Sequence, residues 1–175
     1  EEYVIFIKNA MSKIPDHSRV TEFIPGPGIH KLKLKFDINK LRDCLEKLKL
    51  ENKTQNKNDY GFGVFSLTQR PGQKEWTEND LSGRYWIRGD KHYKEEPREE
   101  LIEEKQFSEF NPKLKGTYFE KVYSELIKRF PIGRMRVLSK GIYNCNSWHR
   151  DPEPRIHIPI ETNPGSLFIV NHHLT

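Results

Sequence analysis

The sequence predicts an α+β domain in which helices come first and an antiparallel sandwich or barrel begins near the C-terminal end. Three observations predict it. Residues 38–51 and 117–130 repeat apolar residues at steps of three and four, which is typical of helices buried by one face. From residue 134 the pattern changes to alternation of polar and apolar residues, which is typical of half-buried strands. The length of 175 residues fits one domain with a single core.

The composition excludes several classes of protein. Apolar residues make up 34% and charged residues 31%, but plentiful aromatic residues and clear periodicity argue against a disordered chain. The formal charge of +5 comes from lysines mixed among acids, as in Glu103-Glu104-Lys105. Interspersed signs are typical of a solvated surface, and no RNP or zinc-finger signature is present. Nucleic acid is therefore not an expected partner.

Cysteine usage and hydropathy point to a cytoplasmic protein. Cys44 and Cys145 have no CxxC partner, so we expect neither a disulfide framework nor a cysteine zinc site. Cys44 lies on the apolar face of the first helix and is expected to be a small buried residue. No apolar run approaches the roughly 20 residues needed to span a bilayer, and nothing resembles a signal peptide.

The first expected elements are a strand, a second strand and a helix. Residues 1–10 contain the strand-forming run Tyr-Val-Ile-Phe-Ile. They precede Met11, which reads like a natural start, so this decapeptide is either vector-derived or genuine sequence displaced from elsewhere. Residues 31–36 alternate polar and apolar and predict a half-buried strand. Asp37 is then placed to cap the helix over 38–51.

The middle of the chain predicts short strands and a long charged excursion. Strands are expected within 61–68 and 85–87, with a turn at 70–72. Residues 89–112 are charged and interrupted by prolines, and one helical stretch is expected around 99–105.

The second long helix is expected over residues 117–130. Thr117 and Glu120 have the spacing of a capping box. Pro131 and Gly133 end the helix. Its aromatic stripe is interpreted as core.

After this helix the sequence predicts strands at 134–138, 155–160 and 167–170, with a turn at 162–165. In 155–160 the three isoleucines occupy alternate positions and are expected to face the core.

The segment between the first two of these strands contains a histidine and an aspartate two positions apart, His149 and Asp151. On extended backbone such side chains point to the same side. An imidazole and a carboxylate, completed by a second histidine, form the facial triad of non-haem iron(II) oxygenases. Zinc is the alternative ion, although a mixed set with open positions favours iron. The other interpretation is a surface histidine beside a loop aspartate.

The following strand carries a second pair of this kind, Arg155 and His157. Their face is opposite to the isoleucines. If that face lines a barrel interior, the buried charge needs an anion, and a carboxylate held by the arginine fork satisfies it. The alternative is an exposed polar face.

Together these residues resemble a known family. Two segments carry the resemblance, Trp148-His149-Arg150-Asp151 and, after it, Arg155-Ile156-His157-Ile158-Pro159-Ile160-Glu161-Thr162-Asn163. They resemble the aspartyl/asparaginyl β-hydroxylase family of Fe(II)/2-oxoglutarate-dependent oxygenases. That family acts on residues in proteins and on free amino acids such as proline. The resemblance covers roughly residues 134–171. It implies a double-stranded β-helix (a cupin-like jelly roll) with flanking helices.

The resemblance also implies the domain layout and the activity. Residues 1–175 would form a single oxygenase domain, with a mixed α/β part over 11–133 and the start of the jelly-roll core over 134–175, incomplete at the C-terminus. The protein would be a dioxygenase (hydroxylase) that uses molecular oxygen. Its substrate would be a small amino acid or a peptidyl Asp or Asn side chain, and the size slightly favours the small substrate.

The resemblance implies a role for each site residue. His149 and Asp151 would be catalytic as Fe(II) ligands. Arg155 and His157 would contact the carboxylates of the co-substrate 2-oxoglutarate, and Ser139 would help to bind it.

One family feature is missing. The distal histidine ligand is expected on a much later strand, but the only later histidines, His172 and His173, end the next strand. The chain is therefore expected to be truncated, or to lack an internal segment, or to be permuted. In the permuted case residues 1–10 follow residue 175 in space, after a missing linker that carries the distal histidine, and close the barrel. Two other functions stay open: a non-catalytic jelly-roll binding module that lacks the distal ligand, and a basic nucleic-acid-associated protein with a fortuitous H-x-D.

Overall fold

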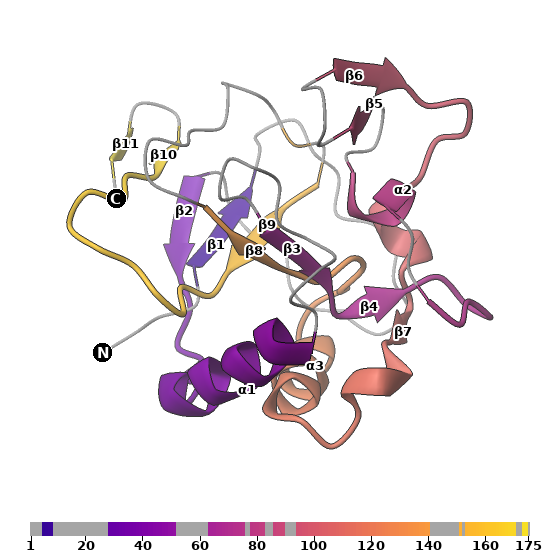
Figure 1. Cartoon of the computed structure of the whole chain (residues 1–175). Helices are drawn as coiled ribbons and strands as arrows, with labels where there is room; N and C mark the ends of the chain where they lie inside the picture. Colours follow the sequence, from indigo (N-terminus) through magenta and orange to yellow (C-terminus); the bar gives the residue numbers. More distant parts are fainter. Residues whose placement is uncertain are drawn as a thin grey trace.

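The two long helices pack against each other on one side of the structure, which is a computed structural model (Figure 1). They are α1 (Ile38–Glu51) and α3 (Tyr118–Ile127). Asp37 caps α1 as predicted, because its carboxylate accepts a hydrogen bond of 3.2 Å from the backbone N–H of Lys40. The structure describes residues 5–8, 28–51, 63–75, 78–82, 86–89, 94–140, 151, 153–170 and 173–174.

Helix α3 forms where predicted, but its N-terminus is not the expected capping box. The hydroxyl of Thr117 donates to the carbonyl of Leu114 at 2.6 Å, and so it is not directed at the helix N–H groups. Glu120 accepts from the backbone N–H of Gly116 at 2.6 Å, one residue before the position that the box requires. The tight turn at Gly116, with φ of 78°, presents that N–H to the carboxylate.

The core is built from the predicted helix faces and from apolar residues of the strands. The buried residues of this cluster are Leu41, Leu45, Leu48, Leu67, Leu114, Phe119, Val122, Leu126, Phe130 and Val137. Ile156, Ile158 and Ile160 pack against it, which confirms that the isoleucines face the core. Cys44 is a free, half-buried thiol beside the same cluster.

A three-stranded antiparallel sheet pairs the first described strand with a strand from the later part of the chain. Its order is β2 (Gly28–Lys31), β1 (Ile5–Lys8) and β9 (Arg155–His157). Phe6 pairs with His30 on one side and with Ile156 on the other. The strand expected within residues 1–10 is therefore confirmed, and it is the central strand of this sheet.

Four two-stranded antiparallel sheets complete the described strands. β3 (Gly63–Ser66) pairs with β8 (Arg136–Ser139), and β4 (Thr68–Gln69) pairs with β7 (Glu109–Phe110). β5 (Trp86–Gly89) pairs with β6 (Lys94–Pro97), and β10 (Ile169–Val170) pairs with β11 (His173–Leu174). Since β10 pairs with β11, residues 1–10 do not close a barrel at the end of 167–170 as the permutation hypothesis required.

Two expected elements are not formed. The strand expected over 31–36 is wrong, because β2 covers Gly28–Lys31 and no strand follows it before α1. Leu32, Leu34 and Phe36 still turn towards the core while the lysines between them are exposed. The helix expected around 99–105 is wrong: that stretch contains only the start of the 3-10 turn η1 (Glu104–Gln106). Two other short turns are α2 (Glu78–Leu81) and η2 (Pro112–Leu114).

The fold class is α+β, as predicted. Within the described ranges the strands form one three-stranded and four two-stranded sheets, not the two facing sheets of a jelly roll. No helix among the described residues has the length and apolar character that a membrane span needs.

Candidate functional site

The structure brings three of the predicted site residues together around strand β9. Asp151 lies four residues before Arg155, and His157 ends the strand. All three are half-buried, so the alternative of a freely exposed polar face does not hold. Ser139 ends β8 opposite Gly63 and is exposed. It makes no hydrogen bond to the other three. His149 lies outside the described residues.

Arg155 is surrounded by carboxylates of the protein itself. Its Nη2 lies 3.0 Å from Oδ1 of Asp151 and 3.7 Å from Oε2 of Glu153. Its Nη1 lies 3.2 Å from Oε1 of Glu104. Burial alone would lower the pKa of Arg155, but the hydrogen bond that it donates to Asp151 and the charges of all three carboxylates raise it. The anion expected beside Arg155 is thus provided by carboxylates of the protein itself.

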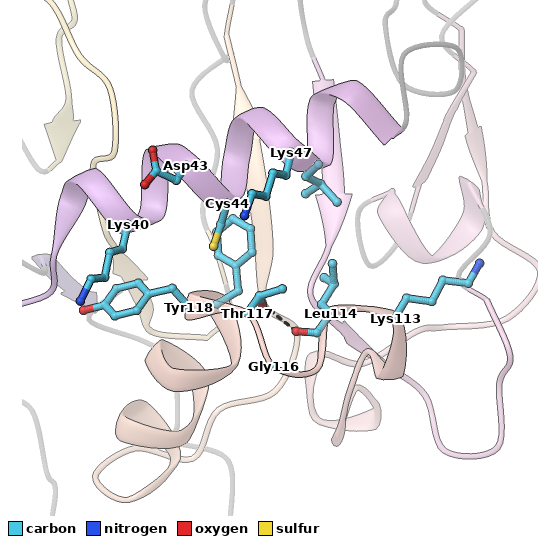
Figure 2. Close-up of a pocket in the computed structure, with 11 residues that line it drawn as sticks. Lys40, Asp43, Cys44, Lys47, Lys113, Leu114, Gly116, Thr117 and Tyr118 are labelled. Carbon is cyan, nitrogen blue, oxygen red and sulfur yellow. Dashed lines mark hydrogen bonds between the residues drawn. The ribbon is translucent and has the colours of Figure 1, made fainter.

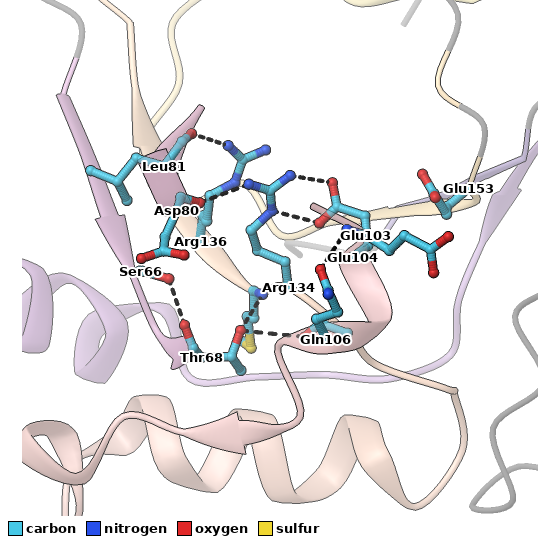
Figure 3. A network of polar contacts seen from close by, with 12 residues as sticks. Ser66, Thr68, Asp80, Leu81, Glu103, Glu104, Gln106, Arg134, Arg136 and Glu153 are labelled. Carbon is cyan, nitrogen blue, oxygen red and sulfur yellow. Dashed lines mark hydrogen bonds and ion pairs between the residues drawn. The ribbon is translucent and has the colours of Figure 1, made fainter. Parts of the chain in front are cut away.

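Glu104 links this arginine to a second one, Arg134. The guanidinium of Arg134 holds the carboxylate with both forks, Nε and Nη2, each at 2.6 Å (Figure 3). The side chains are 1% and 9% exposed, so this is a buried bidentate pair. Burial alone would raise the pKa of Glu104, but Arg134, with smaller effects of Arg155 and Arg136, lowers it to about 2.

Arg134, which lies just before β8, and Arg136, the first residue of β8, also bind the end of helix α2. Nη1 of Arg134 donates to the carbonyls of Asp80 and Ser82, both at 2.7 Å. Nη1 of Arg136 donates to the carbonyl of Leu81 at 2.7 Å. Asp80 is fully buried, and its Oδ1 lies 3.0 Å from Nε of Arg70. The network therefore ties β8, β9, η1 and α2 together through charged side chains.

His157 is poised as a neutral imidazole. Burial and the charge of Arg155 lower its pKa, and the charge of Asp151 opposes them only in part. Its ring lies 4.9 Å from that of Phe168, centroid to centroid. A neutral imidazole at this position can accept a hydrogen bond or donate one.

The residues around Asp151 meet the requirement of a metal site only in part. Within the described ranges no group of three His, Cys, Asp or Glu side chains could hold an ion. Asp151 supplies one carboxylate oxygen donor of the type that iron(II) accepts. The chemistry of the donor set, an imidazole and a carboxylate two residues apart, still suits that ion.

Sequence reasoning missed most of this network. Glu103-Glu104-Lys105 was interpreted as solvated surface, whereas Glu104 is buried. The signal that could have found it is Arg134-Met135-Arg136, because two arginines on one face of a strand beside the core need acidic partners.

A hollow lies away from this network. It has a volume of about 330 Å³ and is formed between α1 and the segment from η2 to the start of α3 (Figure 2). Two of the lysines that line it have partners in the protein. Lys40 lies 3.6 Å from Asp37 and over the ring of Tyr118, and Lys113 pairs with Glu75. None of the predicted site residues lines it.

Comparison of the chain with protein-family models, with curated proteins and with solved structures returned no match.

Proposed function

We propose that this chain is an Fe(II)- and 2-oxoglutarate-dependent dioxygenase that hydroxylates an amino acid or an Asp- or Asn-type side chain. One observation carries the proposal. The carboxylate of the H-x-D segment, Asp151, lies 3.0 Å from the first residue of the R-x-H pair, Arg155. One residue from each half of the motif, Asp151 and Arg155, thus meet in space. A jelly-roll core over 134–175 is part of the proposal.

His149 and Asp151 would hold the iron in this proposal. When bound, the iron would supply the activation of molecular oxygen, coupled to oxidation of 2-oxoglutarate to succinate and carbon dioxide. Side chains of the protein would bind the reactants, orient them and shield them from water.

Arg155 would bind a carboxylate of 2-oxoglutarate by exchanging partners. Asp151 now shares Nη2 of this guanidinium with Glu153. If Asp151 turned towards the iron, it would give up much of its hydrogen bond to Arg155. The N–H groups of Arg155 released in this way would suit a planar carboxylate of the oxo-acid. Glu104 would stay on Nη1 and fix the orientation of the guanidinium.

His157 would complete the recognition of the oxo-acid. Because its pKa is lowered, the imidazole enters the site neutral near pH 7. It can then donate one hydrogen bond without adding a positive charge beside Arg155. Phe168 covers one side of the ring and would limit the access of water.

A non-catalytic binding module remains the second candidate, and two observations favour it. Arg155 is already satisfied by three carboxylates of the protein. In addition, the described residues provide no set of three metal donors.

An anaerobic titration with iron(II) and then 2-oxoglutarate separates the two candidates. The oxygenase is expected to develop the visible charge-transfer band of a chelated oxo-acid. His149→Ala and Asp151→Ala should abolish the band, whereas Asp43→Ala, which removes an exposed carboxylate from α1, should keep it. A folded parent protein that gives no band would exclude the oxygenase and leave the binding module.

A further inference from the structure

The guanidinium of Arg134 is fixed by several contacts at once. Its Nε and Nη2 donate to the carboxylate of Glu104, and its Nη1 donates to the backbone carbonyls of Asp80 and Ser82. These hydrogen bonds occupy four of the five N–H donors of an arginine. The Cζ atom also lies 4.9 Å from the centroid of the buried Phe107 ring. Arg134 is therefore an anchored side chain, and it is too deeply buried to bind a ligand itself.

Glu104 connects this anchored arginine to Arg155. Its Oε1 accepts from Nη2 of Arg134 at 2.6 Å and lies 3.2 Å from Nη1 of Arg155. Its Oε2 is held by Nε of Arg134 at 2.6 Å, and Figure 3 shows both contacts of this bidentate pair. The carboxylate cannot rotate without losing a charge-assisted hydrogen bond to Arg134. Glu104 therefore presents an oxygen in a fixed position to Arg155.

Arg155 is the more accessible arginine of the two. Its side chain is 25% exposed, whereas that of Arg134 is 1% exposed. On Nη2 it has the 36% exposed Asp151 at 3.0 Å and Glu153 at 3.7 Å. A partly exposed pair and a longer contact restrain a side chain less than a short contact with a buried carboxylate. The orientation of Arg155 is therefore determined mainly on the side of Nη1, by Glu104.

We propose that Arg134 is a positioning residue, which acts through Glu104 to set the orientation of the guanidinium of Arg155. An arginine recognises a planar carboxylate only when its N–H groups point at it. Within the proposed function, on which this step rests, Arg134 would thus set the affinity for 2-oxoglutarate without touching it. The positioning itself does not rest on that function, because it depends only on the two pairs that Glu104 makes.

The positioning is measured on the full chain without any ligand, by NMR relaxation of the arginine Nε–H groups. The Arg155 signal is assigned by its loss in Arg155→Lys. In the parent protein its order parameter should lie near that of a rigid backbone, about 0.85. Arg134→Lys keeps the positive charge but loses the fork that holds the carboxylate. Glu104 can then rotate, and the order parameter of Arg155 should fall below about 0.6.

Two further variants separate positioning from a general loss of stability. Leu126→Ala leaves a cavity in the core and should destabilise the protein, but the order parameter of Arg155 should stay that of the parent. In a Glu104→Gln background, Arg134→Lys should lower the order parameter no further, because the residue through which it acts is already changed.

Four results would overturn the positioning role. The first is a parent protein in which Arg155 is as mobile as the exposed Arg129, a comparison that needs no variant to fold. The others are an Arg134→Lys variant that leaves Arg155 as ordered as in the parent, an equal loss of order in Leu126→Ala, and a further loss when Arg134→Lys is added to Glu104→Gln.

A titration with 2-oxoglutarate at saturating iron(II) then tests the link to the proposed function. Arg134→Lys should need about tenfold more 2-oxoglutarate to reach half of the charge-transfer band, because a small misplacement of a binding group is costly. The final intensity of the band should equal that of the parent. An unchanged half-saturation would overturn the role in co-substrate binding. A parent protein without any band would refute the proposed function, and the relaxation result would stand apart from it.

Discussion

At the scale of single residues, Glu104 holds the described site together. It is bidentate to Arg134 and also pairs with Arg155. Glu104→Gln would leave the guanidinium of Arg134, which is 1% exposed, without its counter-charge. We expect a loss of about 3 kcal/mol in the free energy of unfolding, measured by urea denaturation. Glu125→Gln, which breaks the exposed pairs with Lys128 and Arg129, should leave the urea midpoint unchanged. Equal midpoints for the parent and Glu104→Gln would contradict a structural role for this carboxylate.

The same carboxylate should give the protein an acid-sensitive stability. The folded pKa of Glu104 is lowered from 4.5 to about 2. A lowered carboxyl pKa contributes stability that is fully present above the unfolded pKa and is lost as the pH falls through the folded one. Unfolding free energies measured between pH 4.5 and pH 2 should therefore fall steeply in the parent protein. Glu104→Gln should show a shallower slope in this window, and a parallel slope would refute the assignment.

The sequence predicted the residues of this site unevenly. Asp151, Arg155 and His157 could be found because a spacing of two on extended backbone fixes a shared side. Glu104 could not, because its partners lie 30 and 51 positions further along the chain. Its neighbours, Glu103 and Lys105, are typical of a surface. Burial of a charge depends on tertiary contacts, and local composition does not carry that information.

At the scale of elements, the approach of η1 to the segment before β8 positions the charged network. Gly133 precedes Arg134, and a Cβ on Gly133 would overlap the backbone carbonyl of Glu104. Gly133→Ala must therefore push η1 away from β8 and stretch the bidentate pair. We expect a loss of about 3 kcal/mol in the free energy of unfolding, measured by urea denaturation. Gly165→Ala, in an exposed turn where the nearest atom is a side-chain oxygen at 3.2 Å, should cost less than about 0.5 kcal/mol. Similar costs for the two variants would show that the close approach is not required.

Helices were predicted better than strands. The bounds of α1 agree with the apolar periodicity, and α3 begins where predicted but ends at Ile127, three residues before the predicted end. Both helices were found because each buries a single continuous face. Alternation also identified the core-facing isoleucines of 155–160, yet the ladder covers only Arg155–His157. Strand length is set by the partner strand, and β1 pairs with three residues of β9. The pattern of one strand therefore predicts its buried side and not the extent of its pairing.

At the scale of the whole molecule, the topology was the least predictable feature. Strand β1 lies between β2 and β9. The start of the described chain therefore pairs with a strand 150 positions later, as Phe6 does with Ile156. Residues 5–8, part of the decapeptide that the sequence predicted to be either vector-derived or displaced, thus form the central strand of a sheet. Pairing over such a separation has no signature in the local sequence. Closing the loop between the two strands costs entropy, and the free energy gained from their pairing appears only in the folded state.

This topology makes the proposed site depend on residues 1–10. If the chain began at Met11, β9 would lose its neighbour, and the backbone of Arg155 and His157 would no longer be fixed by the sheet. Hydrogen–deuterium exchange at 155–157 should then rise towards the rate of an open strand, whereas the amides of α1 and α3, which pack on each other, should keep their protection. The charge-transfer band expected for iron(II) and 2-oxoglutarate should weaken together with the protection of β9. Unchanged protection at 155–157 would show that β9 holds its place without β1, and that the three-stranded sheet is not what positions the two side chains.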